Sequence, residues 1–472
     1  MICAMKMTET PPDFSLKVRE LASSSRMIDI LSMISSHRIG IKEYYHWEEL
    51  AHREAPNGLT RDEWWVMMKI CRHAQRRETS IPFGADSTFW WTMPDSLIKR
   101  LHEIDVKSGI SVRHDARKMV NDATERYLRE TSPLFEAVTS SQLEGSPTTW
   151  SDAKRMIRTG RAPRDVGERM ILNNYQAMQL ILENYEQPLT TDFILELHRI
   201  LTHDTLEKHD AEGRYRRADE YVRVADDETV FHVPPPASQL AADMEALCAF
   251  ANGDGNDGMY MPDIVRAAVL HFWMGYEHPF CDGNGRVARA LMYWSLLRSG
   301  YSIFEFVSIS NILKKAPSKY VRAFTYVETD AGDLTYFLLH QTEAILRALD
   351  EFRSYVRKKE QAIHAAESLL DGCDLTLRQK TIVARAIRNP GEYFRIVDCQ
   401  RICGVSYATA RSEMIQLQQS GLMEMRKQGN AFVYYPMANL LEKLPYVTKR
   451  RWHDADATAY DETAGTSQGR PL

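Results

Sequence analysis

The chain has 472 residues, and 59 lysine and arginine side chains stand against 64 aspartate and glutamate side chains, for a formal net charge of −5. Hydrophobic residues make up 44% and charged residues 26%, as in an ordinary globular protein, and the length suggests about two to four domains. This composition excludes a largely disordered chain and wholesale coating of nucleic acid or anionic membrane, so any nucleic-acid contact must be local.

No stretch of the sequence resembles a membrane anchor or an export signal. There is no run of about 18 apolar residues, and the start MICAMKMTETPPD has acids and prolines where a signal peptide needs an apolar core. The seven cysteines are scattered, and Cys399 and Cys403 are expected to be buried free thiols rather than metal ligands. We therefore expect a cytoplasmic protein with no membrane partner.

The first 110 residues divide into two parts. Residues 1–25 are polar with a Pro-Pro step and are expected to form a flexible arm. Residues 26–110 form an aromatic-rich accessory region, in which Trp65, Met68 and Cys71 recur at spacings of three within a helical pattern. So many aromatic side chains could form a binding platform, but the helical spacing favours a buried core. The pattern predicts no mechanism for this region.

Residues 111–350 are almost continuously helix-patterned and are expected to form an all-helical core domain, so the predicted fold class is mainly α. One interruption, YVRVADDETVFHVPPP at 221–236, alternates β-type residues around a turn and ends in three prolines that forbid a helix. It predicts a short β-hairpin inserted into the helical domain.

The chemistry is concentrated in the segment that begins at His278. An apolar helix over 263–277 stops there, HPFCDGNGR follows, and a second helix begins near Arg286. Glycines let backbone N–H groups turn toward a ligand, and a helix N-terminus adds positive potential, so the segment predicts an anion site. Arg286 and Arg289 lie on one side of the first turn, where cations oppose the helix dipole unless an anion such as a polyphosphate compensates.

Two further side chains give this site a reaction. Asp282 is a hard oxygen ligand beside the expected phosphate, as Mg²⁺ requires. His278, at the end of a buried helix, is the obvious acceptor for the proton of an attacking hydroxyl. A glycine turn between two core helices with a satisfied histidine would explain any two of these residues but not all of them together.

Residues 375–437 form a separate pattern of helix, helix, turn, helix and hairpin, the order of a winged helix-turn-helix. Nine basic residues against four acidic ones give this segment a charge of +5, although the whole chain is acidic. Winged helices also serve as protein contacts, but the charge favours DNA binding. The tail at 451–472 is poor in aliphatic residues and is expected to be disordered.

The segment HPFCDGNGRVAR, His278–Arg289, resembles the signature of the Fic (Fido) family, His-x-Phe-x-Asp/Glu-Gly-Asn-Gly-Arg-x-x-Arg, at every specified position. The resemblance implies an all-helical domain that transfers AMP from ATP to a Ser, Thr or Tyr hydroxyl of a protein. It makes His278 the general base and Asp282 the Mg²⁺ ligand, and it assigns Arg289 to the γ-phosphate. The nucleotide-binding residues that it implies in this segment are Asp282, Gly283, Asn284, Gly285, Arg286, Val287, Ala288 and Arg289.

Two other segments resemble parts of the same family. The hairpin resembles the flap that holds a target segment by strand addition, which implies that Thr229, Val230, Phe231 and His232 lie near the nucleotide. The stretch KYVRAFTYVETDAGDLTYF resembles the helix that lines the adenine pocket, and Tyr320 is its best candidate for base stacking.

The segment Ser140-Ser141-Gln142-Leu143-Glu144-Gly145 resembles the family's inhibitory motif, Ser/Thr-x-x-x-Glu-Gly/Asn, on a helix that we expect at about 133–145. Ser140 and Glu144 are four apart and share a helical face, and Gly145 can end the helix. In the family this glutamate pairs with the second arginine of the signature. The resemblance therefore implies a Glu144–Arg289 pair that blocks catalysis until it is broken.

These expectations describe a self-inhibited protein adenylyltransferase that uses ATP and Mg²⁺ and modifies a target protein, for which its own chain is one candidate. Two alternatives stay open. The same fold could remove AMP or transfer another phosphate-linked group, or the chain could be a DNA-binding regulator that only senses a nucleotide. The sequence does not reveal the target, a DNA site or the oligomeric state, although family members are often homodimers.

Overall fold

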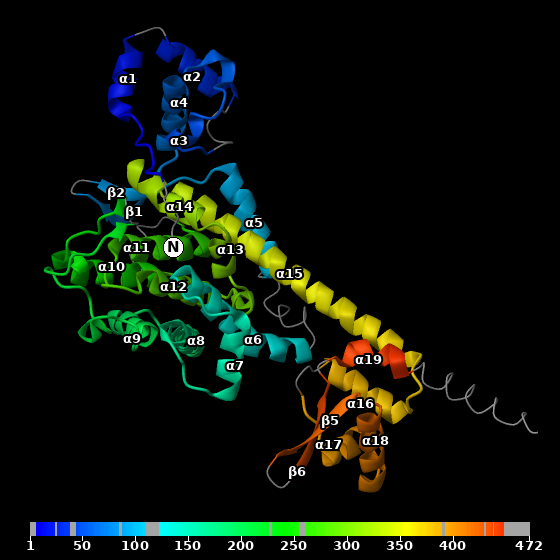
Figure 1. The fold of residues 1–472 in the computed structure, drawn as a ribbon. Helices are drawn as coiled ribbons and strands as arrows, with labels where there is room; N and C mark the ends of the chain where they lie inside the picture. Colours follow the sequence, from blue (N-terminus) through cyan, green and yellow to red (C-terminus); the bar gives the residue numbers. More distant parts are fainter. Residues whose placement is uncertain are drawn as a thin grey trace, which may run out of the picture. The chain divides into compact units, whose positions relative to one another are not determined.

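The computed structural model describes residues 6–23, 26–37, 44–84, 87–109, 122–225, 229–253, 260–388, 392–428, 431–437 and 439–447. The chain forms two compact units, Met1–Lys118 with Arg129–Phe352 and Met119–Leu128 with Arg353–Leu472 (Figure 1). The described residues are mainly helical and their strands are short, which confirms the predicted fold class. Within them, no helix combines the length and apolarity needed to cross a bilayer.

The first unit begins with a small helical region and a two-stranded sheet, followed by a long helix. Its elements are α1 (Phe14–Ala22), α2 (Arg26–His37), α3 (Trp47–Leu50), α4 (Arg61–His73), β1 (Arg77–Phe83), β2 (Ser87–Trp91) and α5 (Asp95–Ser108). Strands β1 and β2 pair antiparallel. Helix α4 begins at a capping box, in which the Thr60 hydroxyl accepts from the Glu63 backbone N–H and the Glu63 carboxylate accepts from that of Thr60.

The expectation of a flexible arm over residues 1–25 is wrong for residues 14–22, which form α1. The Asp13 carboxylate accepts a hydrogen bond from the Leu16 backbone N–H and so caps this helix. Lys17 then pairs with Asp62 at 2.8 Å, and the hydroxyl of Thr8 lies 2.7 Å from that of Thr325. The polar composition that suggested an arm therefore supplies the contacts that fix it. Residues 1–5 and 24–25 lie outside the described residues.

The aromatic residues of this region are core, as their spacing predicted. Six of them are at most 7% exposed: Trp47, Trp64, Trp65, Phe89, Trp90 and Trp91. Buried charges join them, since the ammonium group of Lys69 lies 2.8 Å from the Asp330 carboxylate, which also accepts from the Tyr336 hydroxyl. Arg72 lies 3.8 Å from the same carboxylate. The N-terminal helices of the accessory region therefore have a hydrophobic cluster of their own, which includes Trp47, Trp64 and Trp65, whereas Phe89 and Trp91 belong to the main core of the first unit.

The helical body of the first unit surrounds two central helices. Its elements are α6 (Asp122–Leu143) from Arg129 onward, α7 (Trp150–Thr159), α8 (Val166–Asn184), α9 (Thr191–Thr202), β3 (Val224–Ala225), β4 (Val230–His232), α10 (Leu240–Asn252), α11 (Asp263–Glu277), α12 (Asn284–Arg298), α13 (Ser310–Lys315) and α14 (Pro317–Thr329). Helices α11 and α12 lie side by side and are buried on nearly every face, as expected of helices without a polar stripe. Their junction is the start of the signature segment, residues 278–289.

The predicted hairpin is present. Strands β3 and β4 pair antiparallel with Val224 opposite His232 and Ala225 opposite Val230. The tip at 226–228 lies outside the described residues. We call residues 221–236 the flap.

Helix α14 joins the flap side of the body to the N-terminal region. It ends at Thr329, whose hydroxyl lies 3.1 Å from His46 Nε2, and the His46 ring stacks on Tyr326 with a centroid distance of 4.0 Å. Asp330 follows directly and holds Lys69. Residues 44–84 therefore pack against the helix that, as described below, lines the pocket.

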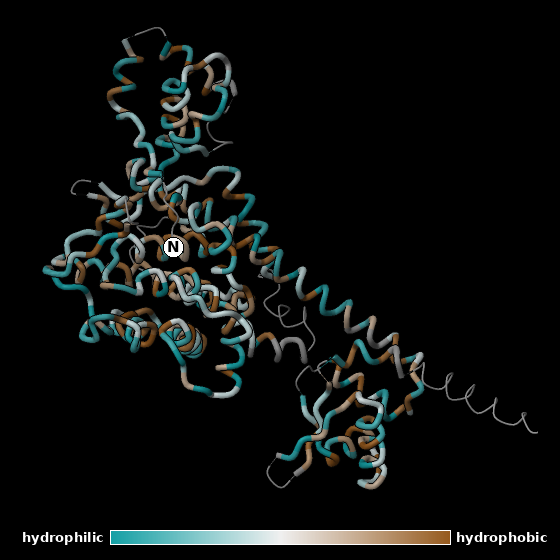
Figure 2. Tube along the Cα trace, viewed as in Figure 1, coloured by the Kyte–Doolittle hydropathy of each residue, from teal (hydrophilic) through white to brown (hydrophobic). Residues whose placement is uncertain are grey.

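Helix α15 (Thr335–Asp371) has residues in both units, and hydrophobic and hydrophilic residues alternate along it (Figure 2). The second unit then contains α16 (Leu377–Arg388), α17 (Ile396–Cys403), α18 (Tyr407–Gln419), β5 (Met423–Gln428), β6 (Ala431–Pro436) and α19 (Leu440–Val447). Phe394 forms a β-bridge with Tyr434 next to the antiparallel pair β5 and β6. Cys399 is buried and Cys403 is half-buried, both as free thiols. The predicted tail at 451–472 lies outside the described residues.

Candidate functional site

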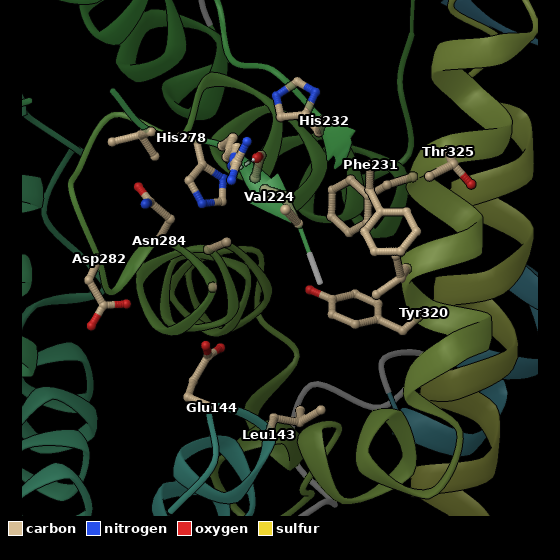
Figure 3. Close-up of a pocket in the computed structure, with 18 of the residues that line it drawn as sticks. Leu143, Glu144, Val224, Phe231, His232, His278, Asp282, Asn284, Tyr320 and Thr325 are labelled. Atoms are coloured by element: carbon tan, nitrogen blue, oxygen red, sulfur yellow. Dashed lines mark hydrogen bonds between the residues drawn. The ribbon is translucent and has the colours of Figure 1, made fainter. Parts of the chain in front are cut away.

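A pocket of about 450 Å³ opens beside the start of α12. Figure 3 shows His278, Asn284 and Asp282 on one side of it, Phe231 and Tyr320 on the other, and Glu144 close to the first turn of α12. The pocket residues come from four places: the end of α6, the flap, the signature segment with the end of α11, and α14. Segments that are up to about 180 residues apart in sequence therefore meet at one cavity.

His278 ends α11 in the left-handed backbone region, with φ 46° and ψ 53°. Its Nδ1–H donates to the Gly275 carbonyl oxygen at 2.9 Å, so in the neutral ring the lone pair lies on Nε2. Burial lowers the pKa of His278 to about 4, which keeps the ring unprotonated at neutral pH. The site therefore holds a neutral imidazole that can accept a proton at Nε2.

The loop after His278 is fixed from a neighbouring helix. His198 of α9 accepts the Gly213 N–H at Nδ1 and donates from Nε2 to the Asp282 backbone oxygen at 3.0 Å. Its ring stacks on Phe280 at 3.7 Å. Burial lowers the pKa of His198 to about 4, so the neutral ring keeps both contacts. No sequence pattern links His198 to the site, because it is 84 residues from Asp282.

The carboxylate of Asp282 faces the pocket and is 60% exposed. One oxygen accepts from the Gly283 N–H and the other lies 3.2 Å from Arg286, whose guanidinium also donates to the Leu201 carbonyl. An exposed carboxylate with a fixed direction is the hard oxygen ligand that Mg²⁺ prefers, so this residue fits the metal that the family resemblance implies.

Asn284 is used differently from the expectation. Its side-chain oxygen accepts from the Phe280 N–H and its side-chain nitrogen donates to the Phe280 carbonyl, at 2.9 and 2.8 Å. Both ends of the amide are therefore engaged by the loop backbone. Asn284 holds the loop in shape, and the first backbone N–H groups of α12, which have no partner within the helix, are the groups that could bind an anion.

Glu144 and Arg289 form the expected pair. Arg289 NH2 donates to Glu144 Oε1 at 2.8 Å, while Arg289 Nε donates to the Ser140 hydroxyl at 2.9 Å. Burial alone would raise the pKa of Glu144, but Arg289 and Arg286 outweigh it and hold the pKa below its ordinary value. The glutamate is therefore ionised at neutral pH, and its carboxylate occupies the face of Arg289 that a phosphate could use.

Helix α6, which ends one residue before Glu144, is anchored by a second glutamate. Glu136 is 4% exposed, and its carboxylate accepts from the Tyr293 hydroxyl at 2.8 Å, from the Ser308 hydroxyl at 2.7 Å and from the Ser310 backbone N–H at 3.3 Å. Glu136, Ser140 and Glu144 are spaced by four and share one helical face. The face that presents Glu144 to Arg289 is thus fixed two turns earlier by a buried carboxylate.

The flap contributes Phe231 and His232 to the pocket wall, whereas Val230 is 37% exposed and does not line it. His232 Nε2 lies 2.6 Å from the Tyr276 carbonyl oxygen, and Nδ1 lies 2.7 Å from a Glu328 carboxylate oxygen. His232 therefore ties the flap both to the end of α11 and to α14. Glu328 itself lines the pocket.

Helix α14 forms the far wall with Tyr320, Val321 and Phe324. The Tyr320 hydroxyl lies 2.7 Å from His271 Nε2, and burial raises the pKa of Tyr320 to about 12 while lowering that of His271 to about 3. Both groups are neutral at pH 7. An aromatic ring held in this way can stack on a planar base, as expected of Tyr320.

The expected site residues divide into two groups. Those that line the pocket are Glu144, Phe231, His232, His278, Asp282, Asn284, Gly285, Ala288, Arg289 and Tyr320. Those that lie outside its lining are Ser140, Gly145, Thr229, Val230, Gly283, Arg286 and Val287. The lining also includes residues that the sequence did not suggest, among them Arg223, Cys281, Thr325 and Glu328.

Comparisons with known proteins find a family match and named relatives. Residues 188–296 match the family described as Fic/DOC family. Two proteins named protein adenylyltransferase Fic, from Drosophila willistoni and Drosophila mojavensis, are each 32% identical over 212 residues, which cover 43% of this chain and 39% and 38% of theirs. The match thus spans about two fifths of the length of these relatives.

A solved structure supports the fold alone. The Fic family protein from Desulfovibrio desulfuricans G20 has a TM-score of 0.50 and 17% identity, over 74% of this chain and 97% of its own. Residues 188–296, which match the family, include α9, the flap, α11 and the complete signature segment. Residues 188–296 of this chain therefore match the Fic/DOC family, and the segment carries that family's complete signature.

Proposed function

We propose that this protein is a self-inhibited adenylyltransferase that transfers AMP from ATP to a Ser, Thr or Tyr hydroxyl of a protein. The observation that carries the proposal is the meeting of a neutral His278, the anion-binding start of α12 and a flap at one pocket. The names of the relatives point to the same activity.

The residues at the pocket can supply the proton acceptor and the charge stabilisation that this transfer needs. His278 Nε2 takes the proton of the acceptor hydroxyl as its oxygen forms a bond to the α-phosphorus of ATP. The bond between the α-phosphorus and the bridging oxygen breaks, and pyrophosphate leaves with the electron pair. The backbone N–H groups at the start of α12 would stabilise the growing charge on the phosphates. Asp282 would hold Mg²⁺, which neutralises phosphate charge when bound.

Self-inhibition follows from the position of Glu144. A triphosphate that reached Arg289 would meet an ionised carboxylate already paired with it, and like charges at contact distance repel. Hence ATP binds in a displaced position until Glu144 moves.

The six cysteines in the described part of the chain are all free thiols, which suits the reducing cytoplasm in which we place the enzyme.

The test uses the full chain, Mg²⁺ and α-³²P-labelled ATP with wild type, E144G and the double variant E144G/H278A. We expect label on the protein or on a lysate protein with E144G alone. Label with E144G/H278A would contradict the role of His278, and no label with any variant would contradict the activity. Release of AMP from a labelled protein, or transfer of a different group, would favour the alternative reactions of the same fold.

A second candidate function is DNA binding by the second unit. The element order from α16 to β6, with Phe394 bridged to Tyr434, suits a winged helix-turn-helix. Arg411 is exposed on α18, and Lys427 is exposed on β5. A gel shift of the full chain with mixed-sequence duplex DNA tests this candidate. We expect a shift at low salt that weakens steeply as salt rises and that R411A/K427A reduces. No shift at low salt would contradict it.

A further inference from the structure

Five consecutive carbonyl groups, at residues 275–279, lie at the end of α11 and in the two residues that follow it. They accept hydrogen bonds from two histidine rings and from Arg216. The last carbonyl groups of a helix have no partner within it and need one elsewhere. His278 Nδ1–H supplies the partner for Gly275, and His232 Nε2–H supplies the one for Tyr276. The remaining three carbonyl groups, of Glu277, His278 and Pro279, all turn to a single residue, Arg216.

Arg216 reaches these groups with both its backbone and its side chain. Its backbone N–H donates to the Pro279 oxygen at 2.8 Å, its Nε to the His278 oxygen at 2.9 Å and its NH2 to the Glu277 oxygen at 3.3 Å. Arg216 is 8% exposed. A buried guanidinium at a helix C-terminus also interacts favourably with the helix dipole. Arg216 therefore caps the C-terminal end of α11, directly beside His278, the proposed base.

The same guanidinium holds the flap. Arg216 NH2 also donates to the Pro235 carbonyl oxygen at 2.5 Å, at the foot of the flap. His232 makes the second connection, since it binds the Tyr276 carbonyl from β4. The flap is thus joined to the end of α11 at Pro235, through Arg216, and at His232, three residues earlier. Arg216 contacts both the flap and the end of α11.

The conformation of His278 makes this support necessary. A non-glycine residue with φ 46° lies in the left-handed region, which costs about 1–2 kcal/mol unless surrounding contacts hold it. The hydrogen bond from Arg216 Nε to the His278 oxygen fixes the peptide that follows this residue, and so fixes the direction of the imidazole. Without it, the helix end can relax and the ring can leave its place beside the phosphates.

We propose that Arg216 is a positioning residue for His278 and couples the direction of the base to the seating of the flap. This inference rests on the proposed adenylyltransferase function. Arg216 does not line the pocket. It acts through the backbone of residues 277–279.

The chain supplies a matched control next to it. Arg217 is 59% exposed, and its side chain pairs only with the exposed Asp210 at 3.4 Å among the contacts of the described residues. Replacing Arg217 removes the same charge from the same segment without touching α11. A difference between R216Q and R217Q therefore reports the contacts with the carbonyl groups rather than the loss of a charge.

The experiment places R216Q, R216K and R217Q in the E144G background and measures steady-state label transfer with the full chain. We expect R216Q to lower kcat about 10- to 100-fold, as displaced catalytic groups do, with KM for ATP changed less than about threefold. R216K keeps one cationic donor and should recover part of the loss. R217Q should match E144G.

The pH profile supplies a readout that loss of stability alone would not move. Burial holds the pKa of His278 at about 4, so a ring that relaxes toward solvent moves toward its ordinary value of about 6.5. We therefore expect the acid limb of kcat for R216Q to lie at higher pH than that of E144G. An unshifted acid limb together with unchanged kcat would overturn the inference.

The outcomes separate the two proposals. If E144G itself transfers no label, the adenylyltransferase function fails and the Arg216 variants are not the cause. If E144G transfers label and R216Q does so equally well, the positioning role is wrong. Thermal melts identify an unfolded R216Q protein, and R216K then decides, because a folded R216K protein with the full rate and acid limb of E144G would also overturn the role.

Discussion

Arg289 holds Glu144 at 2.8 Å across 145 residues of sequence and holds the Ser140 hydroxyl at 2.9 Å with a second nitrogen. A hydrogen bond to a charged group contributes about 1.5–3 kcal/mol, and about 1.4 kcal/mol corresponds to a factor of ten. Under the proposed function, an energy of this size would favour the paired state of Arg289 over contact with a phosphate and could still be overcome by a binding partner.

Graded variants of this contact should give graded activity. S140A removes one hydrogen bond to Arg289 and leaves the carboxylate in place, so we expect a rise in label transfer of about threefold to tenfold over wild type. E144Q removes the charge and should raise it further, toward E144G. The exposed hydroxyl of Ser151 provides the control S151A. A S140A protein as silent as wild type would show that the hydroxyl does not hold Arg289 in the inhibited state.

Loosening the anchor of α6 should also release inhibition without any change at the pocket. E136Q keeps the size of the side chain, but its amide NH₂ group can only donate and so faces hydroxyl and N–H groups that need an acceptor. The lost contacts cost about 1–3 kcal/mol of stability. We expect a lower melting temperature together with more label than wild type. E183Q, at an exposed position on α8, is the control.

The double variant E136Q/H278A shows whether this label needs the proposed base, and it should transfer none. A lower melting temperature of E136Q without added label would mean that α6 stays seated on Arg289 although its anchor is weakened.

The turn into α12 should not tolerate a side chain at residue 283. Gly283 has φ +86°, and a Cβ there would lie 2.8 Å from the Thr202 methyl group. Gly253 has φ +94°, and a Cβ there would meet nothing within 4 Å. G253A therefore pays the backbone strain alone, about 1 kcal/mol, whereas G283A adds a clash with Thr202.

Differential scanning calorimetry of these two variants isolates the clash. We expect a lower melting temperature for G283A than for G253A and a loss of label transfer in the E144G background for G283A only. Equal melting temperatures would show that α9 can move away from the loop at no cost.

Acid should destabilise the protein through its buried histidines. Burial lowers the pKa values of His46 and His271 to about 3 and those of His73, His198, His278 and His340 to about 4. As pH falls below about 6.5, the unfolded chain takes up protons at these sites before the folded chain does, so the free energy of unfolding decreases. A fully buried histidine contributes about 2 kcal/mol of this loss by pH 5.

His271 is the site to test, because H271Q keeps a polar partner for Tyr320 and cannot titrate. Urea unfolding at pH 7 and pH 5 gives the loss of stability for each protein. We expect this loss to be about 2 kcal/mol smaller for H271Q than for wild type. An equal loss would place the acid sensitivity elsewhere.

The signature segment was readable from sequence because its chemistry is local. His278, Asp282 and the glycines act within one turn between two helices, so their spacing alone defines the loop. The Glu144–Arg289 pair was expected only because a family resemblance links two distant motifs. His198 and Arg216 were not expected, because each acts on the backbone of a loop 62 or more residues away and no spacing rule encodes such a contact.

Two polar groups are engaged within the fold in ways that the sequence did not indicate. Asn284 is expected to hold phosphates, which stays a prediction, and both ends of its amide pair with the Phe280 backbone. Residues 14–22 were expected to be flexible because their composition is polar, but Asp13 caps them into a helix whose Lys17 finds Asp62 in α4. In both cases a polar group satisfies a partner within the fold.

The position of α14 sets the smallest piece of this protein that can keep the shape of its pocket. One face of this helix lines the cavity through Tyr320, while its end meets His46 and leads into Asp330, the carboxylate that Lys69 neutralises. A chain cut back to residues 188–296 would lack the helix altogether. A chain begun at residue 110 would keep it but leave Asp330 without its ammonium partner. The shape of the pocket therefore depends on parts of the chain that lie well outside residues 188–296.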